Sequence, residues 1–203
     1  MRPVYQQPPR RERVIGYSPL VPHHSHCARC GTPYGADAGW PRTCPACGER
    51  AYRNPLPVAV ALQPAHDAHG TGLVVITRTI EPALGGTALP GGFIDHGEDW
   101  RHAVVRELRE ETGIEASQDD VRLADVLSSP AGHLLVFGLL PGRPAAELPR
   151  SVPTDETAGW HLLHAPADLA FPLHTTAVRD WFAGAYGHGA PGHFDAGRST
   201  YRR

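Results

Sequence analysis

The chain has 203 residues, of which 41% are apolar, so it can bury the core of one ordinary domain beside a small second module. Its formal net charge of −2 gives the whole molecule no field that favours nucleic acid or an anionic membrane, so any such contact must be local. All 19 basic residues are Arg, which excludes lysine Schiff-base chemistry and a phosphate-loop lysine.

The two ends of the chain lack the apolar periodicity that would let them pack. Residues 1–22 are rich in Pro and Arg and residues 186–203 in Gly and His, so both are predicted to be disordered tails. The N-terminus lacks the apolar run of a secretory signal, and the longest apolar stretch, Leu134–Leu140, is far too short to cross a bilayer. We therefore expect a cytoplasmic protein.

Residues 23–53 contain two Cys-x-x-Cys pairs, formed by Cys27, Cys30, Cys44 and Cys47. Each pair can place two thiolates on one ion, and four sulfur ligands match the tetrahedral preference of zinc. A glycine follows each pair, where a tight turn favours a residue without a Cβ. The spacing predicts a small zinc ribbon with a structural Zn²⁺, because four cysteines leave no open position for water.

Some alternatives stay open for this ribbon. Three histidines are close enough in sequence to compete as zinc ligands: His23, His24 and His26. Two disulfides would fit the cysteine count but not a cytoplasmic location. Four arginines make the ribbon mildly basic, and it could dock nucleic acid, a second subunit or the next domain: Arg29, Arg42, Arg50 and Arg53.

Residues 54–185 are predicted to form the main domain. Short apolar runs between turn residues predict strands at Val58–Leu62, Leu73–Thr77, Leu134–Leu140 and Gly159–Leu163. Apolar residues at helical spacing predict helices at Trp100–Thr112 and Thr176–Ala185. Asp99 can cap the first helix, and Gly113 can end it in a left-handed conformation. A sheet combined with helices gives an α/β or α+β fold.

The first helix carries three glutamates where acidic residues are locally unfavourable. Glu107, Glu110 and Glu111 are neighbours in its last turns, where like charges repel and the macrodipole favours cations. They also border the apolar stripe of the helix. Converging carboxylates are stabilised by a hard divalent cation, Mg²⁺ or Mn²⁺, which is normally shared with substrate phosphates. The helix predicts a metal site for a diphosphate substrate, and a solvated acidic face is the alternative.

The residues around this helix resemble the Nudix box. Gly92, Glu98, Arg106-Glu107-Leu108, Glu110-Glu111 and Gly113-Ile114 stand at its specified positions. The resemblance spans about residues 55–185 and implies an α-β-α sandwich with a mixed sheet. It also implies hydrolysis of a nucleoside diphosphate linked to another moiety, such as NADH, NAD or ADP-ribose.

The resemblance implies a role for each box residue. Glu107, Glu110 and Glu111 would be the principal metal ligands. Glu98 and the carbonyl of Gly92 would support the site, and Arg106 would orient a neighbouring glutamate. Glu156, in a later turn, is a candidate for an additional base or ligand.

The four-cysteine module, followed by Tyr52-Arg53-Asn54-Pro55 and the box, resembles a zinc-ribbon subgroup that includes the NADH pyrophosphatases. In that subgroup a Ser-Gln-Pro-Trp-Pro-Phe-Pro stretch after the box helps define dinucleotide specificity. This chain instead has Ser128-Ser129-Pro130-Ala131-Gly132-His133, which leaves NADH and NAD-capped RNA open as substrates. Relatives with the ribbon suggest a homodimer. A weakly catalytic nucleotide sensor and a nucleic-acid-binding adaptor remain alternative functions.

Overall fold

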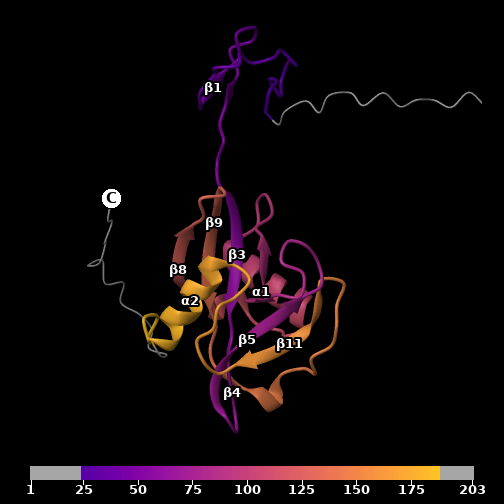
Figure 1. Cartoon of the computed structure of the whole chain (residues 1–203), viewed down its shortest axis with the longest axis vertical. Helices are drawn as coiled ribbons and strands as arrows, with labels where there is room; N and C mark the ends of the chain where they lie inside the picture. The colour runs from indigo at the N-terminus through magenta and orange to yellow at the C-terminus, as the bar shows by residue number, and fades with distance from the viewer. Residues whose placement is uncertain (1–23, 188–203) are drawn as a thin grey trace, which may run out of the picture. The chain divides into compact units, whose positions relative to one another are not determined.

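The computed structural model describes residues 24–187, and the chain separates into two compact units between Asn54 and Pro55. Figure 1 shows the elements in chain order. The predicted tails, apart from Tyr186 and Gly187, lie outside the described residues, as does His23. Within residues 24–187, none of the helices has the length and apolar character needed to cross a membrane.

The N-terminal unit contains two short strands and two tight turns. Strands β1 (Arg42–Thr43) and β2 (Arg50–Ala51) pair antiparallel. Gly31 and Gly48 have φ values of 74° and 72°, a left-handed conformation that explains why a residue without a Cβ follows each cysteine pair. These turns bring the cysteines of each pair onto the same side of the loop.

The second unit contains the remaining strands, two helices and two 3₁₀ turns. Its elements, in chain order, are β3 (Leu56–Leu62), β4 (Pro64–Asp67), β5 (Gly70–Arg78), β6 (Thr87–Ala88), β7 (Gly91–Phe93), α1 (Trp100–Thr112), η1 (Gln118–Asp120), β8 (Arg122–Ser128), β9 (His133–Leu139), β10 (Arg143–Pro144), η2 (Ala145–Glu147), β11 (Thr157–Leu163) and α2 (Pro172–Phe182).

The strands of this unit form two sheets, and both sheets lie between the two helices. One sheet has the order β7-β3-β9-β8, with β3 and β9 parallel and the outer pairs antiparallel. The other has the order β10-β4-β5-β11, with β6 also paired to β5. The parallel pairs β3–β9 and β10–β4 confirm the predicted mixed character of the sheet.

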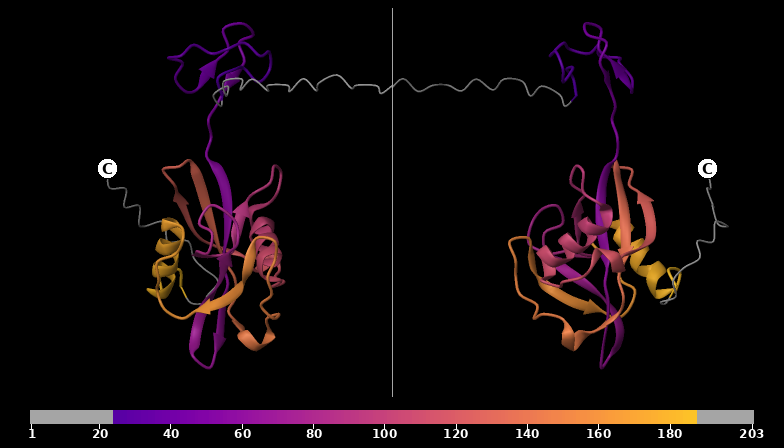
Figure 2. Two further views of the ribbon diagram at one scale, coloured as in Figure 1. Left: turned by 45° about the vertical axis from the view of Figure 1, so that its right-hand side comes forward. Right: turned by 180° about the vertical axis from the view of Figure 1, so that it is seen from behind.

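The helices lie on opposite sides of the strands (Figure 2). Because successive strand residues point to opposite faces, β3 contributes side chains to the packing of both helices. Ala59 and Ala61 belong to the apolar cluster that contains the buried side of α1, whereas Val60 and Leu62 belong to the cluster that contains α2. The predicted α-β-α sandwich is therefore confirmed.

The first helix has the predicted bounds, and the second does not. Asp99 caps α1 by accepting a hydrogen bond from the amide of Arg101, and Gly113 ends it with a φ of 74°. Helix α2 begins at Pro172 and ends at Phe182, earlier at both ends than the predicted helix. Proline suits a first helical position because its missing N–H has no partner there in any case. His174 and Thr175, in the first turns, are polar but buried, so the spacing of apolar residues alone does not predict the start of this helix.

Helix α1 lies directly on strand β9 at Gly138. A Cβ at this glycine would lie 2.8 Å from Cγ2 of Val104 and 2.7 Å from Cγ1 of Val121. We expect Gly138→Ala to lower the free energy of unfolding by about 1–3 kcal/mol, because the helix must move outward. Gly142→Ala is the control, since its Cβ would meet Pro64 at an ordinary 3.7 Å. Equal losses for both variants in urea denaturation would contradict this account.

His174 of α2 is a buried base with a fixed partner. Its Nδ1 accepts a hydrogen bond from the amide of Leu89 at 3.2 Å, and the rings of Phe137 and Phe171 lie against it. Burial, together with the charge of Arg78, lowers the pKa of His174 to about 4. The unfolded chain takes up this proton near pH 6.5. The folded state therefore disfavours the charged imidazole.

This depressed pKa predicts a loss of stability in acid. The contribution of His174 is fully present above about pH 6.5 and decreases as the pH falls toward 4, by about 3 kcal/mol in total. His174→Asn keeps an acceptor near the position of Nδ1 and removes the titration. Denaturant unfolding between these pH values should therefore depend less on pH in the variant. Parallel profiles for the two proteins would rule the assignment out.

Candidate active site

The acidic residues of α1 line one pocket of about 510 Å³ with strand β7 and the loop before β11. The structure thus brings the box residues Gly92, Arg106, Glu107, Glu110 and Glu111 together with Glu156, whereas Glu98 is bonded to Arg106 and is not among the lining residues. The lining residues are Gly91, Gly92, Phe93, Asp95, Arg106, Glu107, Glu110, Glu111, Thr154, Asp155 and Glu156.

Glu111 is the most buried carboxyl group of the pocket. Its side chain accepts a hydrogen bond from the amide of Gly91 at 2.8 Å, and the residue is only 3% exposed. Burial raises the pKa of Glu111 to about 8, and the charges of Glu107 and Glu156 act in the same direction. The amide of Gly91 thus holds this glutamate in place, and the role expected for the carbonyl of Gly92 at an ion stays a prediction.

Glu107 lies over the second glycine of β7. A Cβ at Gly92 would overlap the carboxylate of Glu107, which explains why this position is a glycine. Burial raises the pKa of Glu107, while the hydrogen bond from Arg106 at 2.6 Å opposes that shift. Two adjacent carboxyl groups on α1 are therefore held in a setting that penalises negative charge without a cation.

Arg106 connects the carboxylates of the box. Its Nε and Nη2 donate to the two oxygens of Glu98 at 2.8 and 2.9 Å, a bidentate pair. Its Nη1 donates to Glu107 and, at 3.2 Å, to Glu110. The bonds from Arg106, more than any other group, lower the pKa of Glu98 to about 2. Glu98 therefore stays ionised and anchors the guanidinium rather than accepting a proton.

The loop that carries Glu156 is tied to both neighbouring elements. Thr157 Oγ1 donates to the backbone carbonyl of Glu111 at 3.1 Å, and the amide of Thr79 donates to the carbonyl of Glu156 at 2.9 Å. These bonds hold the turn beside the end of α1. Glu110 is the most open of the three helix glutamates, with its side chain 51% exposed.

Asp95 and Thr154 also line the pocket and were not singled out in the sequence. Phe93 is 55% exposed and follows the two glycines of β7. Asp95 lies between this strand and α1, in the loop that Glu98 closes by accepting a bond from the Asp95 amide at 3.0 Å. The run Gly91-Gly92-Phe93-Ile94-Asp95 could have predicted these residues, because it connects the end of a strand to the acidic helix and so lies near the pocket.

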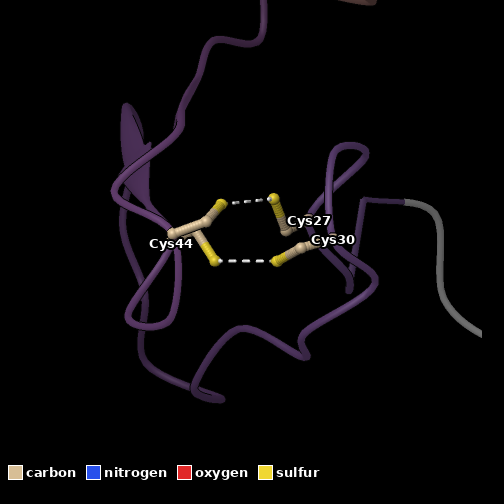
Figure 3. A group of neighbouring side chains, drawn as sticks. Cys27, Cys30 and Cys44 are labelled. Atoms are coloured by element: carbon tan, nitrogen blue, oxygen red, sulfur yellow. Dashed lines mark hydrogen bonds between the residues drawn. The ribbon is translucent and has the colours of Figure 1, made fainter.

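The four cysteines form a second, separate cluster in the N-terminal unit. Their sulfur atoms lie within 4.8 Å of one another, with 3.7 Å between Cys27 and Cys47 and 3.5 Å between Cys30 and Cys44 (Figure 3). Cys27 and Cys44 are buried and the other two are exposed. Four converging thiols fit a tetrahedral zinc ion. Neither described histidine is part of this group, and His26 Nδ1 instead contacts Ser25 Oγ at 2.8 Å.

Comparisons with known proteins agree with this geometry. The NUDIX domain model matches residues 55–183. The NAD-capped RNA hydrolase NudC of Stutzerimonas stutzeri (strain A1501) is 29% identical over 164 residues, which cover 76% of this chain and 56% of that protein. The ADP-ribose pyrophosphatase of Methanocaldococcus jannaschii is 34% identical over 113 residues, covering 54% of this chain and 64% of that protein.

The solved structures include a close match in fold. The crystal structure of a NUDIX hydrolase from Nitrosomonas europaea has a TM-score of 0.63 and 20% identity, and the match covers 82% of this chain and 95% of that one. At this identity the likeness supports the fold alone. The chain spans little more than half the length of the NudC relative, so that protein's activity is not transferred as a whole.

Proposed function

We propose that this chain, which belongs to the Nudix family, hydrolyses the diphosphate bond of a nucleoside diphosphate linked to another moiety. The observation that carries the proposal is the pocket in which buried Glu111 and half-buried Glu107 converge with Glu110 and Glu156. Carboxylates in this number, partly withdrawn from water, suit the binding of a divalent cation and a phosphorylated substrate.

Glu107, Glu110 and Glu111, with the carbonyl of Gly92, would hold Mg²⁺ or Mn²⁺. The cation would neutralise the charge of the diphosphate and acidify a water molecule. Arg106 holds Glu107 and Glu110 in place while Glu98 fixes Arg106, so the ligands need little reorganisation when substrate arrives.

Hydrolysis also requires a group that accepts a proton from water. Glu156 is our candidate, because it is one of the residues that line the pocket and its backbone carbonyl is bonded to the amide of Thr79. The charge of Glu156 also contributes to the raised pKa values of Glu107 and Glu111, which supports this choice. Asp155, next to Glu156 in the turn, also lines the pocket.

The N-terminal cysteines would hold a structural Zn²⁺ and take no part in the reaction. All four are used in one closed cluster, so no position is left for water or substrate. The ribbon predicted at residues 23–53 would thus fold around its metal, and the domain predicted at residues 54–185 would carry the chemistry.

The names of the relatives support NAD-like substrates: NAD-capped RNA for the NudC protein and ADP-ribose for the archaeal enzyme. The test is a magnesium-dependent hydrolysis screen of NADH, NAD, ADP-ribose, dinucleoside polyphosphates and nucleoside triphosphates. We expect turnover of at least one diphosphate-linked dinucleotide or sugar, and a large loss in Glu110→Gln. Equal activity in the wild-type protein and Glu110→Gln would refute the assignment. Nucleotide binding without turnover would favour a sensor.

A further inference from the structure

The first cysteine pair lies in a short hairpin that also contains Tyr34. The amide of Cys27 donates to the carbonyl of Thr32 at 2.8 Å, and His26 lies opposite Pro33 in an antiparallel bridge. Side chains alternate between the two faces of paired extended segments. With His26 and Pro33 on one face, the side chains of Cys27, Thr32 and Tyr34 share the other face.

The hydroxyl group of Tyr34 is buried and has no hydrogen-bond partner among residues 24–187. Burial raises the pKa of Tyr34, and Cys27, followed by Cys44 and Cys47, acts in the same direction. The hydroxyl therefore lies beside the sulfur cluster. A buried hydroxyl without a partner destabilises a folded unit, so a partner is expected at this position.

The ring of Tyr34 is held in place by Arg42. The guanidinium carbon of Arg42 lies 5.6 Å from the centre of this ring and 4.6 Å from the centre of the Trp40 ring. Arg42 itself donates to the backbone carbonyls of His24 at 2.7 Å and Ala38 at 3.0 Å. These contacts keep the Tyr34 hydroxyl inside the unit, so its partner has to come from the unit itself.

The thiolate form of Cys27 fits this requirement. A neutral thiol is a weak hydrogen-bond acceptor, whereas a zinc-bound thiolate carries negative charge and accepts strongly. Cys27 is only 2% exposed, so water has little access to its sulfur in place of the hydroxyl. Groups that donate to metal ligands orient those ligands and stabilise their charge.

Cys30, the other cysteine of the pair, also has a hydroxyl neighbour, but in a different setting. Its Sγ donates to Oγ1 of Thr32 at 3.3 Å, and a Cys30 thiolate would accept from the same hydroxyl. Cys30 is exposed, so a water molecule can take the place of this hydroxyl. Loss of the Thr32 hydroxyl can thus be compensated, whereas loss of the Tyr34 hydroxyl cannot.

We propose that the Tyr34 hydroxyl donates a hydrogen bond to the zinc-bound thiolate of Cys27 and thereby strengthens zinc binding. Tyr34 is in this account a positioning residue of the metal site and not a ligand. Its role rests on the proposed zinc ribbon but not on the proposed hydrolysis, because Tyr34 and Cys27 lie outside the catalytic pocket.

The test measures the zinc affinity of the full chain by competition with a chromophoric chelator. We expect Tyr34→Phe to weaken zinc binding about tenfold, as for other groups that donate to metal ligands. Phenylalanine keeps the ring that packs against Arg42, so only the hydroxyl is removed. Cobalt in place of zinc gives a second readout. A thiolate that loses a hydrogen bond holds its electrons less tightly, so the sulfur-to-cobalt charge-transfer band should shift to longer wavelength.

Tyr52→Phe is the matched control, because Tyr52 is 58% exposed and its ring also lies near an arginine, Arg50, at 5.9 Å. This variant and Thr32→Val should bind zinc like the wild-type protein. If Tyr34→Phe and Tyr52→Phe have equal zinc affinity, or if the cobalt band of Tyr34→Phe does not move, the role of Tyr34 is refuted while the zinc ribbon stands. A wild-type chain that binds neither zinc nor cobalt would overturn both.

Discussion

Replacing the buried glutamate of the pocket, Glu111→Gln, should lower kcat for diphosphate hydrolysis by about a thousandfold or more. Glu111 has the least exposed carboxyl group of the site, and this group accepts a hydrogen bond from the amide of Gly91. The amide of glutamine keeps the shape and can still accept that bond, but it lacks the charge that holds a cation. A loss of several kcal/mol of transition-state stabilisation corresponds to this decrease.

The same substitution should not harm the fold. A carboxylate that is buried without a cation destabilises the folded chain, so a neutral amide in its place should leave unfolding by urea unchanged or shift it upward. Glu115→Gln is the matched control, because it makes the same change just beyond the end of α1 and outside the catalytic pocket. Its kcat should equal that of the wild-type protein. Full activity in Glu111→Gln, or the same loss in both variants, would exclude Glu111 as a ligand.

Local sequence signals were sufficient for the acidic helix and its glutamates. Asp99 and Gly113 mark its two ends, and the repulsion among the glutamates marks the helix as a candidate metal site, so no distant partner is needed to predict either. The cysteine pairs are equally local, because the turn after each pair depends on one glycine. In both cases the information lies within a few turns of chain.

The missed elements depend on partners far along the chain. Strand β7 contains two glycines and one aromatic residue, and it exists because it pairs with β3. Strand β8 is an edge strand whose pairing with β9 shifts between Leu123 and Asp125, so its apolar alternation is broken. The position of Glu156 beside α1 likewise depends on the pairing of β11 with β5. The spacing of residues along the sequence does not predict these long-range strand pairings.

The N-terminal unit should lose its structure when zinc is removed, while the catalytic unit keeps its own. Within residues 24–54, the only buried apolar side chains are those of Cys27 and Cys44, which are 2% exposed each. Such a unit has almost no core, and a structural zinc contributes about 10–16 kcal/mol of apparent binding free energy at pH 7. We expect one zinc per chain by elemental analysis, and loss of dispersed amide signals from this unit after chelation.

Substitution should reproduce the effect of chelation one ligand at a time. Cys44→Ser replaces a buried thiolate by a hydroxyl that binds zinc poorly, so zinc content should fall and trypsin should cleave at Arg42 and Arg50. Ser25→Ala is the control, because its hydroxyl contacts His26 and not a sulfur atom, and it should keep the metal. The melting transition of residues 55–187 should be the same in all three proteins, since that unit has its own apolar clusters on both faces of the sheets. Retained protection of the N-terminal unit in zinc-free Cys44→Ser would mean that chain packing, rather than the metal, folds this part of the molecule.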